Sequence, residues 1–160
     1  MNEATEVQIY GEHLQERIAA IGATLDGLTD EHVAWVPDLA EANSLCVIAT
    51  HALECARSYV LDITCGLDVG RDRPAEFASQ KSADELRALA RTIGREIKQA
   101  LDEMDPARLD VQSVPKQAVW GTGETREVPG RWALTHMVAH LSVHLGQMQI
   151  TRDLALRESA

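Results

Sequence analysis

Three of the six histidines in the chain lie close together near its C-terminal end. His136, His140 and His144 follow one another in steps of four residues. In an α-helix a step of four residues turns the side chain by only about 40°, so neighbouring members of this group lie one turn apart on the same face. Two imidazoles at this spacing can bind one metal ion. The sequence therefore predicts that either His136 and His140 or His140 and His144 ligate a metal, and the spacing does not distinguish the two pairs.

A third ligand has to come from another element, and His51 is the natural candidate. It lies in the middle of an apolar helical stretch, residues 48–53. Burying neutral imidazoles without hydrogen-bond partners costs about 1–3 kcal/mol each, whereas a metal ion satisfies them together. The alternative for the C-terminal group is a row of histidines on a solvent-facing surface. We interpret His13 and His32 as ordinary hydrogen-bonded or partly exposed histidines.

Other polar side chains are expected near these histidines. Glu54 and Cys55 follow His51 by three and four residues and share its helical face, so either could contact a metal-ligating histidine. Cys55 could also be a fourth ligand, although a small core residue is the more common role of such a cysteine. Gln147 lies between His140 and His144 in angular position on the helix, and it could hold a ring N–H or a metal-bound ligand, or be an amide at the edge of the core.

Several other kinds of site are excluded by their motifs. A ferritin-type di-iron site needs Glu-x-x-His on two helices, and no histidine of the cluster has a glutamate three residues before it. H-E-x-x-H and Gly-x-Ser-x-Gly are also absent from the sequence. The stretch at residues 121–125 lacks the lysine and the length of a phosphate-binding loop and is typical of a turn.

Four segments have the apolar periodicity of amphipathic helices, and they must position these residues. They are residues 7–28, 44–65, 82–104 and 131–156. The third opens with Ser82 and Glu85 at capping-box spacing. We also expect a short helical turn at residues 29–33 and a small hairpin or extended loop at residues 111–128. Aromatic residues make up only 4% of the chain, which favours an aliphatic core between helices. The fold class predicted is all-α, a four-helix bundle with long connections, in one domain over residues 1–160.

Composition narrows the possible partners. The chain has 25 acidic and 15 basic residues, a formal charge of −10, which disfavours binding to nucleic acid or to anionic lipid. The longest apolar run, residues 45–49, is far too short to span a membrane, and the acidic first residues do not resemble a secretion signal. The three cysteines form no Cys-x-x-Cys and cannot all pair with one another. A cytoplasmic location is therefore expected.

In these features the chain resembles the DinB/YfiT-like metalloenzymes. The resemblance covers most of the chain, and its most specific part is the histidine-rich stretch HMVAHLSVHLGQ at residues 136–147. The other stretches are LDGLTDEH at residues 25–32, Trp35, Pro37, and NSL at residues 43–45 leading to His51. The resemblance implies a four-helix bundle whose divalent metal is held by His51, His140 and His144. It implies that His136 is a neighbour of the site and not a ligand.

The resemblance also implies an activity. Members with an assigned activity include metal-dependent transferases and isomerases that use low-molecular-weight thiols such as mycothiol or bacillithiol. We therefore expect a divalent metal ion (zinc or nickel, or else iron), an open coordination position, a small-molecule substrate and a homodimer. Thiol transfer is preferred to hydrolysis on the resemblance alone. The alternatives are a non-catalytic or stress-associated dimeric metal-binding bundle, and a metal-free helical interaction module.

One departure and several further residues bear on the substrate. Leu145 stands where the family often has arginine, so an anionic substrate could lack a partner there. Trp120 and Trp132 could line the mouth of a pocket or pack in the core. Three arginines could bind carboxylates or be solvated surface charges. These are Arg71, Arg73 and Arg131.

Overall fold

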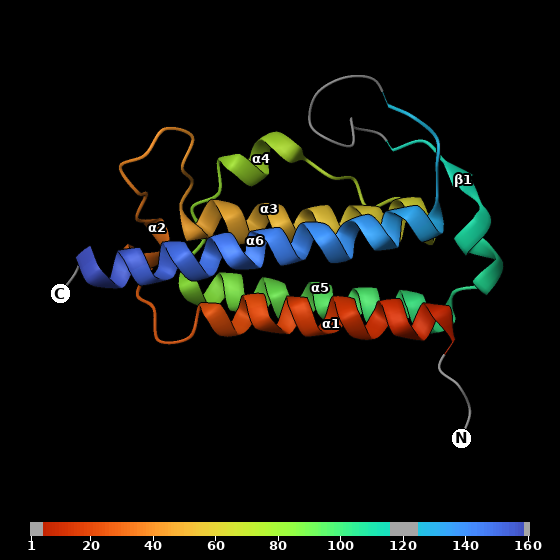
Figure 1. The fold of residues 1–160 in the computed structure, drawn as a ribbon, viewed down its shortest axis with the longest axis horizontal. Helices are drawn as coiled ribbons and strands as arrows, with labels where there is room; N and C mark the ends of the chain where they lie inside the picture. Colours follow the sequence, from red (N-terminus) through yellow and green to blue (C-terminus); the bar gives the residue numbers. More distant parts are fainter. Residues whose placement is uncertain (1–4, 116–124, 159–160) are drawn as a thin grey trace.

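The structure is a computed structural model that describes residues 5–115 and 125–158. Its framework is four long helices, as predicted from the apolar periodicity (Figure 1). These helices are α1 (Glu6–Thr24), α3 (Leu45–Arg57), α5 (Ala83–Glu103) and α6 (Gly130–Glu158). Helix α3 packs beside α6, and α1 packs against both α5 and α6. The predicted four-helix bundle is confirmed, and a single domain over residues 1–160 stays a prediction.

Three of the helices begin with a side-chain cap. Thr5, Ser44 and Ser82 each accept a hydrogen bond from the backbone N–H three residues on, which satisfies a donor that has no partner inside the helix. At Ser82 the bond is reciprocal, because Glu85 Oε2 accepts from the Ser82 N–H at 2.7 Å. The predicted capping box is therefore present.

The second predicted helix, residues 44–65, is continuous but changes from α-helical to π-helical geometry. Helix α3 ends at Arg57, and a π-helical turn, η1 (Ser58–Thr64), carries the chain on to Cys65. The Thr64 hydroxyl donates to the carbonyl of Tyr59, five residues back, at 3.1 Å. Six of the seven residues of η1 are buried, so the apolar pattern gives no sign of the wider turn.

The connections hold shorter elements. The expected helical turn is α2 (Asp30–Ala34), and a 3-10 turn, η2 (Pro106–Asp110), follows α5. The expected hairpin before the last helix is a pair of two-residue antiparallel strands, β1 (Gln112–Ser113) and β2 (Val128–Pro129). Residues 121–124 of the turn predicted at residues 121–125 lie outside the described residues. A further helix, α4 (Arg73–Phe77), was not predicted and lies over α3 (Figure 1).

Aliphatic side chains from all four long helices fill the interior. Leu14, Leu53, Ile97 and Leu134 have no exposed surface. Burying such a side chain contributes about 1.5–3 kcal/mol, so this core fixes the positions of α3 and α6. In the part of the chain that is described, no helix is both long and apolar enough to cross a membrane.

Candidate metal centre

Helices α3 and α6 bring His51, His140 and His144 together. One ring nitrogen of each lies within 4.8 Å of those of the other two. The Nε2 atoms of His140 and His144 are 3.2 Å apart. Two nitrogens bound tetrahedrally to one ion at roughly 2.0–2.1 Å lie about 3.3 Å apart. The spacing of this pair therefore fits a shared cation.

The three histidine rings meet edge to face. The ring planes of His140 and His144 make an angle of 74°, with centroids 4.4 Å apart. His51 meets His140 and His144 at 63° and 87°. The steep angles are compatible with ring edges, where the nitrogens lie, directed toward a common point.

His51 is held by an acidic residue from outside the bundle. Its Nδ1 lies 2.8 Å from Oε2 of Glu76, on α4. A carboxylate can only accept, so Nδ1 carries the proton and donates it. The Nε2 atom of His51 is thereby left with a free lone pair, as a metal ligand requires.

His144 is held in the same way by a neutral group on its own helix. Its Nδ1 lies 2.7 Å from Oε1 of Gln147, three residues on. The amide oxygen accepts, so Nδ1 donates, and Nε2 of His144 presents a lone pair toward His140. Holding a ring N–H is one of the alternatives that the sequence left open for Gln147.

His140 cannot satisfy both of its nitrogens. Its Nδ1 is buried and has no hydrogen-bond partner among the described residues. If Nε2 donates to His144, the buried Nδ1 lone pair lacks a donor. If Nδ1 carries the proton instead, that N–H lacks an acceptor and two lone pairs face each other. A cation between the Nε2 atoms removes the repulsion between the lone pairs and gives both atoms a partner.

Burial keeps the donors in the state that binds metal. Burial, with smaller contributions from the neighbouring His144 and His51, lowers the pKa of His140 to about 3. Burial also lowers the pKa of His144. A neutral imidazole is the form that ligates a metal. Both side chains are therefore neutral at physiological pH.

Glu76 is a residue of the site that was not predicted from the sequence, and its partner is Arg71, one of the three arginines considered there. Only 2% of Glu76 is exposed, and its carboxylate accepts from Arg71 Nε at 2.5 Å and from Nη2 at 2.9 Å. Burial acts to raise the pKa of Glu76, but the hydrogen bonds from His51 and Arg71 act the other way and lower it below its ordinary value. Glu76 is therefore a buried carboxylate between two donors.

A local signal for the helix that carries Glu76 is present in the sequence. Asp72 caps the N-terminus of α4 by accepting from the N–H of Ala75 at 3.1 Å, and Pro74 lies in its first turn. Asp followed closely by Pro is a helix-start pattern. The helix could therefore have been predicted, but the contact of Glu76 with His51 could not.

Glu54 and Cys55 do not join the histidine cluster. Among the described residues, the metal-competent group contains only the three histidines. The carboxylate of Glu54 lies 3.8 Å from Arg57 Nη1, and burial raises its pKa. Cys55 is 5% exposed, and burial raises the pKa of its thiol to about 11. The buried position of Cys55 favours the alternative of a small core residue.

His136 lies beside the cluster, one turn before His140. Its ring stacks on Trp132 with centroids 4.8 Å apart and contacts Tyr59 at 5.4 Å. The His136 and His140 rings are 5.8 Å apart. The guanidinium carbon of Arg126 lies over the Trp132 ring, 5.3 Å from its centroid. An aromatic wall thus continues from the cluster along α6; Trp120 lies outside the described residues.

The three arginines of the sequence analysis differ in their surroundings. Arg71 is buried against Glu76, with 10% of its side chain exposed, so its interpretation as a solvated charge is wrong. Arg73 lies 4.8 Å over the ring of Phe77, which in turn lies 5.1 Å from the His51 ring. Arg131 is more exposed and forms ion pairs with Glu6 and Asp110.

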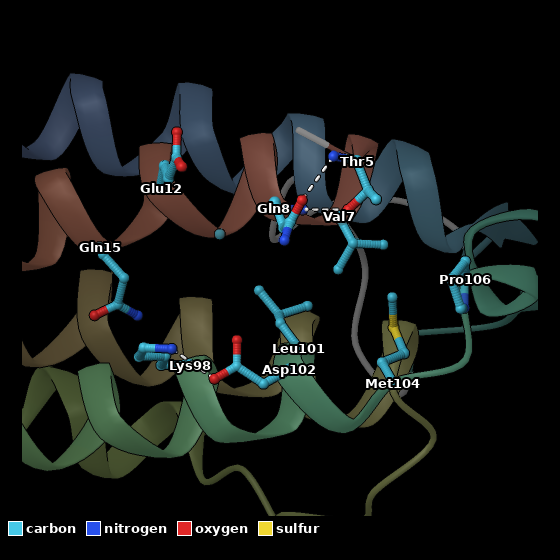
Figure 2. Close-up of a pocket in the computed structure, with 11 residues that line it drawn as sticks. Thr5, Val7, Gln8, Glu12, Gln15, Lys98, Leu101, Asp102, Met104 and Pro106 are labelled. Carbon is cyan, nitrogen blue, oxygen red and sulfur yellow. Dashed lines mark hydrogen bonds and ion pairs between the residues drawn. The ribbon is translucent and has the colours of Figure 1, made fainter. Parts of the chain in front are cut away.

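A separate groove between α1 and α5, of about 530 Å³, offers no comparable chemistry (Figure 2). Figure 2 shows its polar side chains, among them Lys98 paired with Asp102 at 2.5 Å. No histidine or cysteine is among the residues that line it. The histidine cluster therefore remains the candidate site.

Comparison with known proteins agrees with this arrangement. The family model of the mycothiol-S-transferases, "MST: Mycothiol-S-transferase", matches residues 11–155, a range that includes His51, His140 and His144. No match to this chain was found among curated proteins. The predicted relationship to DinB/YfiT-like proteins is confirmed, because the matched family is one of them. With nearly its whole length matched, the chain belongs to the mycothiol-S-transferase family.

Proposed function

We propose that this protein is a metal-dependent S-transferase that joins the sulfur of mycothiol to an electrophilic small molecule. The observation that carries the proposal is the convergence of three histidine nitrogens within 4.8 Å, in a chain matched by the mycothiol-S-transferase model over residues 11–155. The proposal needs both observations. The histidine cluster alone supports metal binding but does not indicate a reaction, and the family match alone does not identify the residues that bind the metal.

The donor set fits a divalent ion held by His51, His140 and His144. Three neutral imidazoles suit zinc, nickel and iron, and they leave a coordination position for another ligand. When bound there, such an ion acts as a Lewis acid and lowers the pKa of a coordinated thiol, so that sulfur becomes nucleophilic at neutral pH.

The chain's own residues orient the ligands and shape the site. Glu76 and Gln147 accept the Nδ1 protons of His51 and His144, which fixes each ring with Nε2 turned inward. His136 and Trp132 form an apolar and aromatic wall beside His140. Leu145, where the family often has arginine, packs against the core and provides no positive charge. We therefore infer that the electrophile does not depend on a cation at this position.

The test is metal analysis followed by an activity assay. The purified protein is expected to contain one divalent ion per chain, and His51→Ala, His140→Ala and His144→Ala are each expected to lose it. His13→Ala is the matched control, since about half of that side chain is exposed. The loaded protein is then expected to consume mycothiol when an electrophilic aryl halide is added. Metal retention by His51→Ala would show that the ligand set is wrong.

A bound ion without an exchangeable ligand would support the non-catalytic metal-binding alternative instead. The assay separates the two, because only an enzyme with an open position consumes thiol and electrophile together. We also infer a homodimer, on the resemblance alone. Light scattering coupled to size exclusion tests it, with a mass near twice 17.6 kDa expected.

A further inference from the structure

We propose that Arg71 and Glu76 are a positioning pair for His51 with opposite effects on the metal: Glu76 strengthens metal binding and Arg71 limits it. The proposal rests on the proposed metal site and assigns roles to two residues that are not themselves ligands. It depends on the contacts of one buried carboxylate.

Both oxygens of that carboxylate are occupied. Oε1 of Glu76 accepts from Arg71 Nε at 2.5 Å, and Oε2 accepts from Arg71 Nη2 at 2.9 Å and from His51 Nδ1 at 2.8 Å. With the Glu76 side chain 2% exposed and that of Arg71 10% exposed, water competes little for these bonds. The orientation of the carboxylate is therefore set jointly by its two partners.

This arrangement makes the three histidines unequal. His51 donates to a charged carboxylate, His144 donates to a neutral amide, and His140 Nδ1 has no partner among the described residues. A proton shared with a carboxylate leaves the imidazole more electron-rich than one shared with an amide. His51 is therefore the strongest donor of the three.

Arg71 balances the charge that Glu76 brings. The guanidinium and the carboxylate together carry no net charge beside the cluster. Without Arg71, the negative charge of Glu76 would be uncompensated, and it would attract a divalent cation on the other side of the His51 imidazole. In the metal-free protein the same buried carboxylate would lack half of its hydrogen bonds, which would destabilise the fold. Without the charge of Glu76, the positive Arg71 would repel the cation, and His51 would lose its charged acceptor.

The segment that carries Glu76 has other attachments to α3. The hydroxyls of Ser79 and Thr50 are 2.9 Å apart, and the Cys46 thiol lies 3.4 Å from the same Ser79 hydroxyl. Asp72 caps α4 independently of the site. Changing the charge of Glu76 is therefore expected to leave α4 in place.

The experiment measures the affinity of the full-length, metal-stripped protein for cobalt(II) and zinc by competition with a chelator. Glu76→Gln, which keeps the shape of the side chain, is expected to bind about 10–100-fold more weakly than the wild type. Arg71→Met is expected to bind about tenfold more tightly. The visible spectrum of cobalt(II) is expected to shift in Glu76→Gln, since the donor strength of His51 changes.

Conservative variants separate charge from packing. Arg71→Lys keeps the charge but loses the two-pronged contact, so its affinity should stay near that of the wild type while Arg71→Met tightens. Glu54→Gln and Arg73→Met are the matched controls, because Glu54 and Arg73 lie near the pair and neither belongs to the histidine cluster. Should Arg71→Met fail to fold, Arg71→Gln removes the charge while keeping an N–H donor for Glu76, and it is likewise expected to bind metal more tightly than Arg71→Lys.

The outcomes also separate this proposal from the proposed function. If the wild type binds metal and His51→Ala does not, the site is established whatever the pair does. The pair is then refuted if Glu76→Gln binds as tightly as Glu54→Gln, or if Arg71→Met and Arg71→Lys weaken binding alike. If the wild type binds no divalent ion, both the site and the pair are refuted.

Discussion

Replacing His140 by leucine should stabilise the metal-free protein and abolish the stabilisation that metal provides. His140 is the histidine of the cluster whose polar atoms are least satisfied, because its buried Nδ1 has no partner among the described residues and its Nε2 faces another histidine at 3.2 Å. Its helical neighbours Met137 and Leu141 are buried. Leucine brings a similar volume and no polar atoms to that position.

The expected gain follows from the unsatisfied nitrogen. A buried polar atom without a partner costs about 1–3 kcal/mol, and imperfect packing of leucine offsets part of its removal. We therefore expect His140→Leu to raise the free energy of unfolding of the metal-free protein by about 1–2 kcal/mol at pH 7.5. Zinc at 100 times its dissociation constant should stabilise the wild type by about 2.7 kcal/mol and the variant hardly at all.

The pH dependence provides an independent check. Burial lowers the pKa of His140 from 6.5 to about 3 in the folded chain, so below pH 6.5 the unfolded chain binds a proton that the folded chain cannot. Stability is therefore lost as the pH falls from 6.5 toward 3. At pH 5 the loss due to this residue is about 1–2 kcal/mol, after allowance for partial solvent screening. The advantage of His140→Leu should grow by that amount between pH 7.5 and pH 5.

Urea unfolding followed by circular dichroism measures both effects, with a chelator present for the metal-free state. His13→Leu is the control, because that side chain is half exposed and its replacement should change stability little. A metal-free His140→Leu less stable than the wild type would refute the claim that the cluster is strained without metal. A stability difference that does not change with pH would refute the burial argument.

Two further predictions concern residues outside the ligand set. Cys55→Ala should retain one divalent ion per chain, since Cys55 lies outside the metal-competent group. As a small truncation in the core, it should lower the free energy of unfolding by about 1 kcal/mol. Loss of the ion on metal analysis would show that Cys55 is a ligand. Ser82→Ala should lower the free energy of unfolding by about 1 kcal/mol, because its hydroxyl caps α5 by accepting from the Glu85 N–H at 3.2 Å. The melting temperature should fall by about 2–4 °C with metal content unchanged, and an unchanged melting temperature would show that the cap contributes nothing.

The proximity of His140 and His144 could be predicted from the sequence because it depends on helical repetition, although the spacing fits His136 and His140 equally well and only the resemblance favours the later pair. His140 and His144 are one turn apart on any helix, and their convergence requires no knowledge of the fold. Placing His51 beside them required the packing of α3 on α6. The apolar stripes show which face of each helix is buried, but they do not show which helices are neighbours. Gln147 could be predicted for the same reason, since it lies on the same helix as the histidine that it holds.

Glu76 could not be predicted in this way because its contact depends on tertiary placement. It lies 25 residues from His51, on a five-residue helix within a polar connection, and a glutamate there is normally expected to be solvated. Hydrogen bonds from Arg71 and His51 compensate the burial of its charge. The π-helical turn at Ser58–Thr64 was missed for another reason, since a run of buried residues shows no periodicity to distinguish one helix type from another.

The His140 and Glu76 experiments test different sources of metal affinity. A cluster of neutral, poorly satisfied nitrogens binds a cation because the cation relieves strain that already exists in the metal-free protein. The charged carboxylate of Glu76, on the far side of His51, instead attracts the cation electrostatically, and this attraction contributes only when the ion is bound. If His140→Leu stabilises the metal-free protein and Arg71→Met leaves affinity unchanged, strain relief dominates. If Arg71→Met tightens binding while His140→Leu gains nothing, the affinity comes from the charge that α4 contributes, and the four helices serve mainly to bring the three rings together.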